Sequence, residues 1–130
     1  MDEHLTLHET RKILQRGPHG GATLLPRIFM TGNNLWRGSR LKMWITQDKK
    51  SLVVTTENTI LMFTREDLVP VGDYGLGIHA VRSGKDEFKY PIITLPQKYL
   101  DMNDLSHGDA INIYTTPMEG CVVIKKKERE

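Results

Sequence analysis

Residues 95–113 read LPQKYLDMNDLSHGDAINI, and residues 25–43 read LPRIFMTGNNLWRGSRLKM. Placing Leu25 over Leu95 sets an offset of 70 residues, the difference between the two positions, and the register continues without a gap to the end of both segments. The identical positions include Pro26 with Pro96, Asn33 with Asn103, Leu35 with Leu105, Gly38 with Gly108, Thr46 with Thr116 and Val53 with Val123. Because a fixed internal offset is the signature of a repeated structural unit, the sequence predicts two tandem copies of one small unit.

Each copy carries the signals of a short helix. Proline has no N–H and is tolerated in the first turn of a helix, so Pro26 and Pro96 predict helices that begin directly after them. Asn34 and Asp104 stand at the other end of these segments. Asn and Asp accept the left-handed backbone conformation that ends helices. We therefore expect short helices within residues 27–33 and 97–103.

A β-hairpin is predicted after each helix. Apolar and polar residues alternate beyond the turn glycine, which is the two-residue period of a half-buried strand. In the first copy we expect strands at residues 41–46 and 52–54, joined by a turn at 47–50. In the second copy we expect strands at 111–113 and 122–124, joined by a turn at 117–120. A unit of half this length buries too little surface to be stable alone, so the two copies must share a core. The predicted fold class is mainly β, with one short helix per copy.

The composition is that of a globular protein. The 130 residues are 38% hydrophobic and 26% charged, without the low hydrophobicity and high net charge of disordered chains. The start, Met1-Asp2-Glu3-His4, is acidic and leads into no apolar run, so we expect neither a secretory signal nor a membrane anchor. A single cysteine, Cys121, excludes an internal disulfide and fits a reducing compartment. The sequence predicts a cytoplasmic protein.

The second copy resembles the swapped-hairpin domain of the AbrB/SpoVT/MazE family. The resemblance lies in the segments Ile92 to Leu100, Leu105 to Ile113 and Val122 to Lys126. Family members typically join a strand ending in an apolar-proline step to a short helix, a Gly-Asp turn and a final hairpin. The first copy, from Thr10 to Val54, resembles the pattern more loosely. Members usually exchange hairpins between two identical chains, so the resemblance implies a fused tandem swapped-hairpin β-barrel within this one chain.

This interpretation divides the chain into four parts that form one compact body. They are an N-terminal tail at residues 1–9, a first AbrB-like repeat at 10–57, a linker at 58–77 and a second repeat at 78–127. The linker contains the apolar segment Ile60 to Phe63, a candidate for an added strand. Neither copy has the Asp-x-x-Gly-Arg step that many members carry before the apolar-proline strand. MraZ proteins, which also fuse two units, carry that step, so the chain is not assigned to them.

Basic residues dominate the first copy. No Asp or Glu occurs between Glu9 and Asp48, although the net charge of the whole chain is only +2. A cluster of positive charges of this kind favours DNA binding, because each phosphate that it neutralises releases condensed counterions. The resemblance likewise implies a protein that binds double-stranded DNA, and in particular a transcription regulator, with the more acidic second copy mainly completing the barrel. The expected DNA-binding residues are Arg11, Lys12, Arg16, His19, Arg27, Arg37, Arg40 and Lys42.

Several alternatives stay open at the level of sequence. The basic side chains could simply be solvated on separate faces of a barrel, as exposed basic residues commonly are. The family also includes MazE-type antitoxins, so the alternative function is a protein-binding module, and a homodimer or another protein partner is compatible with either function. Trp36 and Trp44 could stack on bases, although core or interface packing explains them better. The closing run from Lys125 to Glu130 is interpreted as a solvated, fraying tail.

The sequence contains no convincing catalytic or metal-binding constellation. His4 and His8 have the four-residue spacing of helical metal ligands but lie in a polar N-terminal segment, so we predict no metal site. Cys121 begins the last predicted strand, where a buried, inert thiol is expected. The glycines of residues 17–21 lack the order of a nucleotide-binding loop and fit either a hairpin tip or a loop laid along DNA. We therefore expect neither an enzyme nor a cofactor.

Overall fold

The computed structural model describes residues 5–18, 20–35, 39–56, 68–71, 76–77, 79–80 and 91–128. Its first half contains β1 (Thr6–Lys12), β2 (Leu14–Arg16), β3 (Gly20–Leu24), α1 (Arg27–Gly32), β4 (Arg40–Thr46) and β5 (Ser51–Thr56). The rest of the chain contains β6 (Leu68–Pro70), β7 (Leu76–Gly77), β8 (His79–Ala80), β9 (Pro91–Thr94), α2 (Gln97–Met102), β10 (Ala110–Thr115) and β11 (Cys121–Lys126).

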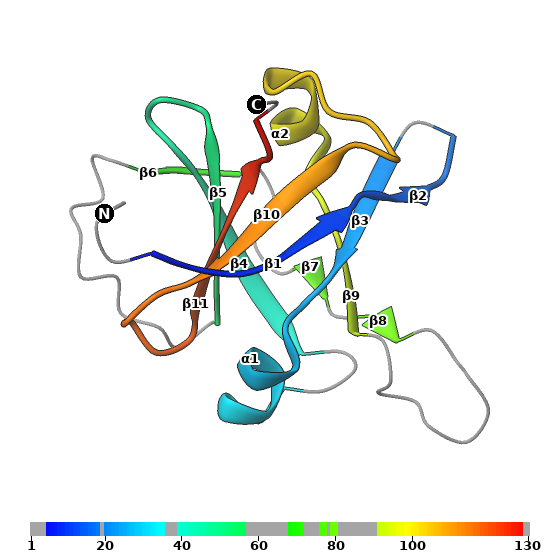
Figure 1. Cartoon of the computed structure of the whole chain (residues 1–130). Helices are drawn as coiled ribbons and strands as arrows, with labels where there is room; N and C mark the ends of the chain where they lie inside the picture. Colours follow the sequence, from blue (N-terminus) through cyan, green and yellow to red (C-terminus); the bar gives the residue numbers. More distant parts are fainter. Residues whose placement is uncertain are drawn as a thin grey trace.

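The strands form two antiparallel sheets, and the two helices lie at opposite ends of the molecule (Figure 1). The seven-stranded sheet has the order β1-β10-β11-β5-β4-β6, with β7 also paired with β4. The four-stranded sheet has the order β2-β3-β9-β8. Within the described residues, neither order closes on itself. The predicted mainly β fold class is confirmed.

The helices and hairpins recur at the predicted offset. α2 begins and ends 70 residues after α1, and β11 begins and ends 70 residues after β5. Asn34 and Asp104 both have a φ of 52°, the left-handed conformation expected where these helices end. The side-chain amides of Asn33 and Asn103 each donate to the carbonyl oxygen four residues back, at 2.8 and 3.0 Å. The predicted helices and hairpins are therefore confirmed, together with the left-handed conformation of Asn34 and Asp104.

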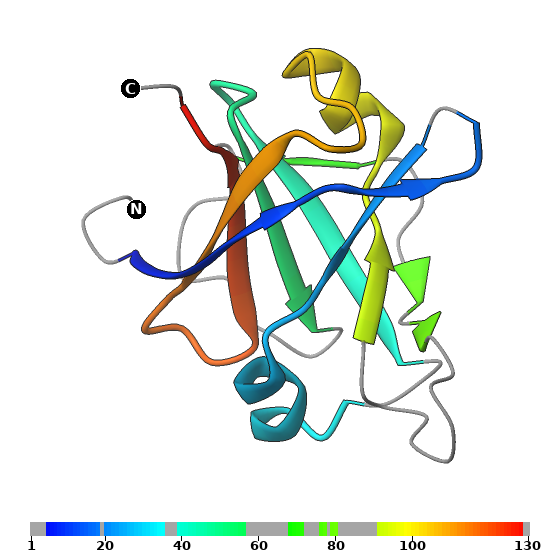
Figure 2. The ribbon, with the colours of Figure 1, turned by 45° about the vertical axis from the view of Figure 1, so that its right-hand side comes forward.

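Two strand pairs join equivalent strands of the two halves of the chain. β5 pairs with β11, and Val53 lies opposite Val123 at the centre of that pair. β3 pairs with β9, and Thr23 lies opposite Ile93. Because each central pair joins residues 70 apart, the halves meet about an approximate two-fold axis. Each hairpin is also flanked by a strand of the other half, since β10 pairs with β1 and β4 pairs with β7 (Figure 2).

The main hydrophobic core is built from the inward faces of the sheets and from both helices. Tyr99 of α2 is fully buried within it. The Tyr99 hydroxyl lies within hydrogen-bond distance of the carbonyl oxygens of Lys50, at 3.0 Å, and Ile124, at 3.2 Å. Burial raises the pKa of Tyr99 above its ordinary value, so the hydroxyl keeps its proton and can donate. These contacts tie α2 to the β4–β5 turn and to β11.

A second apolar cluster lies on the outward face of the seven-stranded sheet. It contains Val53, Leu68, Cys121 and Val123, and the half-buried Trp44 packs against it, as the packing interpretation of this tryptophan predicts. Burial raises the pKa of the Cys121 thiol to about 11, although a hydrogen bond with Thr116 opposes the shift. The thiol is therefore protonated at neutral pH and has little reactivity, as expected for a buried cysteine.

Strand pairing extends into the segments interpreted as a tail and a linker. β1 begins at Thr6, within the segment interpreted as an N-terminal tail, because its backbone pairs with β10. The predicted linker contributes β6 and β7, which both pair with β4. The apolar segment Ile60 to Phe63 and the residue Trp36 lie outside the described residues.

The turn between β4 and β5 is closed by the carboxylate of Asp48. The Thr46 hydroxyl donates to Asp48 Oδ1 at 2.6 Å, and the Lys50 N–H donates to the same oxygen at 3.0 Å. These two bonds, the Thr46 bond above all, hold the pKa of Asp48 below its usual value of 3.8. The folded protein therefore prefers the ionised carboxylate more strongly than the unfolded chain does.

Asp48→Asn is expected to lower stability slightly at pH 7 and to weaken its acid dependence. Stability that comes from a depressed carboxyl pKa is present above the unfolded value of 3.8 and is lost as the pH falls through the lower folded value. Urea unfolding at pH 7 and pH 3 should therefore show a difference between wild type and Asp48→Asn that shrinks at pH 3. The control is Asp104→Asn, since Asn34 already occupies the equivalent left-handed position. A difference that stays constant with pH would contradict this account.

Candidate nucleic-acid interface

β1 and β2 form a nearly continuous ribbon along the edges of both sheets (Figure 1). Ile13 lies between the two strands and anchors the ribbon. Its N–H donates to the Asp109 carbonyl at 2.9 Å, and its carbonyl accepts from the Gly108 N–H at 2.8 Å. Its side chain lies so near Gly21 that a Cβ at position 21 would be 2.5 Å from Ile13 Cγ2, which explains the glycine there. The ribbon is therefore fixed at its midpoint, while residues on either side of Ile13 are exposed.

The outward side of β1 and β10 carries polar and cationic side chains. The Thr10 hydroxyl donates to Asn112 Oδ1 at 2.6 Å, and Asn112 Nδ2 donates to the Tyr114 hydroxyl at 3.3 Å. Lys125 lies opposite Asn112 in register, and its Nζ is 5.9 Å from the centroid of the Tyr114 ring, within cation–π range. Lys12, two residues after Thr10, is on the same side and exposed. We call these five residues the β1–β10 face.

Arg11 belongs to the opposite side of β1. It lies opposite Ile111 in register, and Glu9 lies opposite Ile113, and both isoleucines are buried. Arg11 Nε and Glu9 Oε1 are 2.7 Å apart, and the Arg11 side chain is 36% exposed. The ion pair offsets the charge of Arg11, which makes this arginine a weaker partner for phosphate than its place in a basic stretch suggests.

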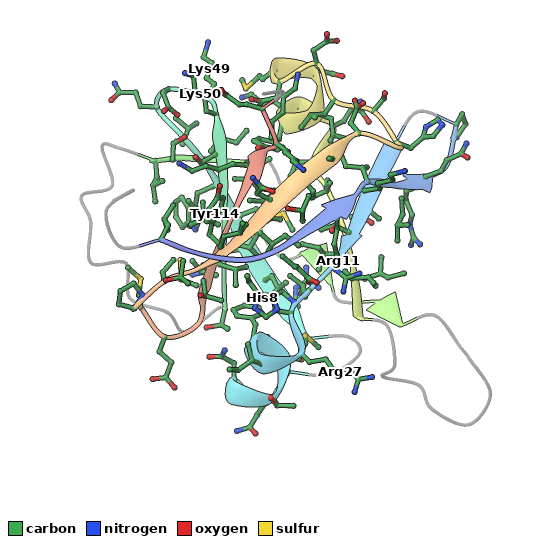
Figure 3. The ribbon with its side chains drawn as sticks, viewed as in Figure 1. His8, Arg11, Arg27, Lys49, Lys50 and Tyr114 are labelled. Carbon is green, nitrogen blue, oxygen red and sulfur yellow. The ribbon has the colours of Figure 1, made fainter. Side chains whose placement is uncertain are left out.

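The predicted DNA-binding residues do not gather on one surface. His19 and Arg37 lie outside the described residues. Arg11 lies on the ribbon, whereas Arg27 lies at the α1 end of the molecule (Figure 3). Arg40 and Lys42 belong to β4, which is separated from β1 by three strands of the same sheet. The structure therefore places Arg11, Lys12 and Arg16 on the ribbon, Arg27 on α1, and Arg40 and Lys42 on β4.

Sequence reasoning missed the second-half residues of the β1–β10 face, which are Asn112, Tyr114 and Lys125. The interpretation of the closing charge run as a fraying tail is wrong for its first residues, because β11 extends to Lys126. The Lys127 N–H still donates to the Ala110 carbonyl at 3.1 Å. The alternation of polar residues along β10 was a signal that this strand has one exposed side, but its neighbours could not be inferred from it.

No metal centre is found in the described part of the chain, where no three His, Cys, Asp or Glu side chains gather closely enough to hold an ion. His4, one of the two histidines with helical spacing, lies outside that part. None of the described helices is both long enough and apolar enough to cross a membrane.

Comparison with known proteins adds no relative. Protein-family models, curated proteins and solved structures give no match to this chain. Its function must therefore be inferred from its own residues.

Proposed function

We propose that the protein is a cytoplasmic DNA-binding regulator, built from two AbrB-like repeats fused into one swapped-hairpin barrel, and that its β1–β10 face contacts double-stranded DNA. The flanking of each hairpin by a strand of the other half supports the swapped arrangement. The pairing of β5 with β11 about Val53 and Val123 supports a fusion of two equivalent units.

The observation that carries the DNA proposal is the sign of the charge along this edge of the molecule. Lys12 and Lys125 belong to the β1–β10 face, and the exposed Arg16 lies farther along the same ribbon. Glu9 is the one carboxylate in β1, β10 and β11, and it lies on the opposite side, paired with Arg11. Clustered cations are what a phosphate backbone binds. Two carboxylate residues lie nearby, Asp48 close to Lys125 and Asp109 bonded through its backbone to Ile13, so the positive charge is strongest at Lys12 and Arg16.

The shape of this edge also suits a duplex. β1 and β10 form an antiparallel pair at the sheet edge, and the major groove of B-DNA admits a two-stranded ribbon. The two lysines and Arg16 would contact phosphates. Asn112 carries an amide that can bind an adenine edge bidentately once Thr10 and Tyr114 release it to the base. The proposal thus assigns the affinity to the cations and the sequence preference to Asn112.

Mobility-shift titrations with mixed-sequence duplexes at 50 and 200 mM salt test the proposal. If three phosphate contacts form, the affinity should fall by about 40-fold over this range, because each contact releases condensed counterions. Absence of binding at 50 mM salt, or tighter binding to single strands of the same sequence, would contradict duplex recognition. Recovery of one stoichiometric protein partner without nucleic acid would instead favour the MazE-type protein-binding module.

A further inference from the structure

An open depression of about 410 Å³ lies where α1 ends. Its volume falls within the usual range for small-molecule sites. It is bordered by Gly32 and Leu35, and its polar lining comes from the end of α1, the start of β4, the end of β5 and the β10–β11 turn. These polar residues are Asn33, Asn34, Ser39, Arg40, Thr56 and Glu119.

At the other end of the molecule, the chain itself occupies the equivalent position. Lys126 Nζ donates to the backbone carbonyl oxygen of Asn103 at 3.0 Å. Asn103 Nδ2 donates to the Lys49 carbonyl at 2.8 Å, which fixes this residue against the β4–β5 turn. The last carbonyl groups of a helix lack partners within the helix and favour a nearby cation. α2 therefore ends against a primary ammonium group supplied from β11.

Two sequence differences between the halves explain why no side chain of the described residues fills the equivalent position beside the end of α1. Thr56 stands 70 residues before Lys126, and its side chain ends at the γ position, whereas the lysine ammonium is at the ζ position. Gly32 stands where α2 has Met102. Asn33 keeps the helix-end amide bond of Asn103, at 2.8 Å to the Phe29 carbonyl. The end of α1 thus resembles the end of α2, which accepts the Lys126 ammonium group. At α1, however, the depression takes the place of that ammonium group.

The charges around the depression differ from those at α2. Glu119 stands at the position equivalent to Lys49, so a carboxylate replaces an ammonium group. Arg40 stands at the position equivalent to Ala110, so a guanidinium is added. The depression is therefore lined by one side chain that attracts a cation, Glu119, and one that attracts an anion, Arg40.

We propose that this depression binds a small ligand that carries a primary ammonium group and a carboxylate, such as a free α-amino acid. The ammonium takes the place that Lys126 Nζ has at the other end, next to the Asn33 carbonyl and Glu119. The carboxylate pairs with the Arg40 guanidinium, which can hold it through two parallel hydrogen bonds. This inference is independent of DNA binding, since it rests on the comparison of the two helix ends.

Isothermal titration calorimetry of the full chain with each of the twenty standard α-amino acids tests the proposal. Propylamine and propionate serve as probes that carry one charge each. We expect saturable binding of at least one amino acid, and weaker binding of either single-charge probe. Glu119→Gln and Arg40→Gln should each raise Kd by about tenfold or more, because each removes charge-assisted hydrogen bonding to the ligand. Lys98→Gln, on the exposed side of α2, is the matched control and should leave Kd unchanged.

Thr56→Lys provides a sharper test, because it restores the lysine found in the second half. Its ammonium should occupy the depression, so the variant is expected to melt at a higher temperature than wild type without ligand and to lose amino-acid binding. Failure of all twenty amino acids to bind wild type would overturn the proposal. So would binding that is unchanged in Thr56→Lys and Glu119→Gln, because the ligand would then sit elsewhere. Propylamine that binds as tightly as any amino acid would overturn the zwitterionic ligand class.

Discussion

Replacing Lys12 and Lys125 together with glutamate is expected to lower the affinity for duplex DNA by about 100- to 1,000-fold at 50 mM salt, because two charge-assisted phosphate contacts are lost. These lysines come from opposite halves of the sequence and are brought together by the pairing of β10 with both β1 and β11. Each lost phosphate contact should also reduce the slope of log affinity against log salt by about one. Fluorescence anisotropy with a labelled duplex measures both quantities.

The control for this experiment reverses the same number of charges at the α1 end. Arg27→Glu with Arg40→Glu changes the net charge equally, but both residues lie away from the β1–β10 face. We expect at most a modest loss of affinity in this variant, through the general field of the protein. Equal losses in the two double variants would mean that net charge rather than this face determines binding, and the proposed interface would be wrong.

Tyr99→Ala is expected to lower the free energy of unfolding by about 3–5 kcal/mol, the usual cost of truncating a buried aromatic side chain. The ring fills the core beneath α2, and the hydroxyl joins this helix to the carbonyls of Lys50 and Ile124. Tyr99→Phe keeps the ring and removes only the hydroxyl, so it should cost about 1–2 kcal/mol. Urea unfolding followed by far-ultraviolet circular dichroism gives these values.

Two further variants check this assignment. Phe29 occupies the position equivalent to Tyr99 and is also buried, so Phe29→Ala should be comparably destabilising. Ile28 is 67% exposed, so Ile28→Ala should change stability by less than about 0.5 kcal/mol. Similar losses in Tyr99→Ala and Tyr99→Phe would contradict the importance given to the ring.

The helices and hairpins could be predicted because their signals are local. The prolines, the left-handed Asn34 and Asp104 and the alternating strands each act over a few residues. β1 and β7, the strands that pair with the hairpin of the other half, gave no such signal; we call them the leading strands. β1 is an edge strand exposed along most of its length, so most of its side chains are polar and lack the alternation of a half-buried strand.

The leading strands also follow a different offset. Lys12 pairs with Ala110, and Gly77 pairs with Arg40, so positions 12 and 77 are structurally equivalent although they are 65 rather than 70 residues apart. The segment between the leading strand and the next long strand is therefore five residues longer in the second half. An ungapped comparison of the two halves cannot align these strands, and the predicted repeat therefore starts at residue 78, after β7 has ended.

The candidate interface was predicted in part. The excess of basic residues in the first half could be counted, and it included Lys12 and Arg16. The pairing of Arg11 with Glu9 could have been anticipated, since residues two apart on a strand share a side. The contribution of Lys125 could not have been anticipated. It depends on the pairing of β10 with β11 and of β10 with β1, and β1 lies about a hundred residues before β10 in the sequence.

The approximate two-fold axis through the Val53–Val123 pair has a consequence for how this molecule can change. In a dimer of two identical half-length chains, every substitution would occur at both ends at once, so an ammonium at one helix end would also be present at the other. Covalent fusion of the halves removes that constraint. One end can retain a lysine that stabilises the fold, as Lys126 does, while the other acquires the smaller Thr56 and becomes free to specialise.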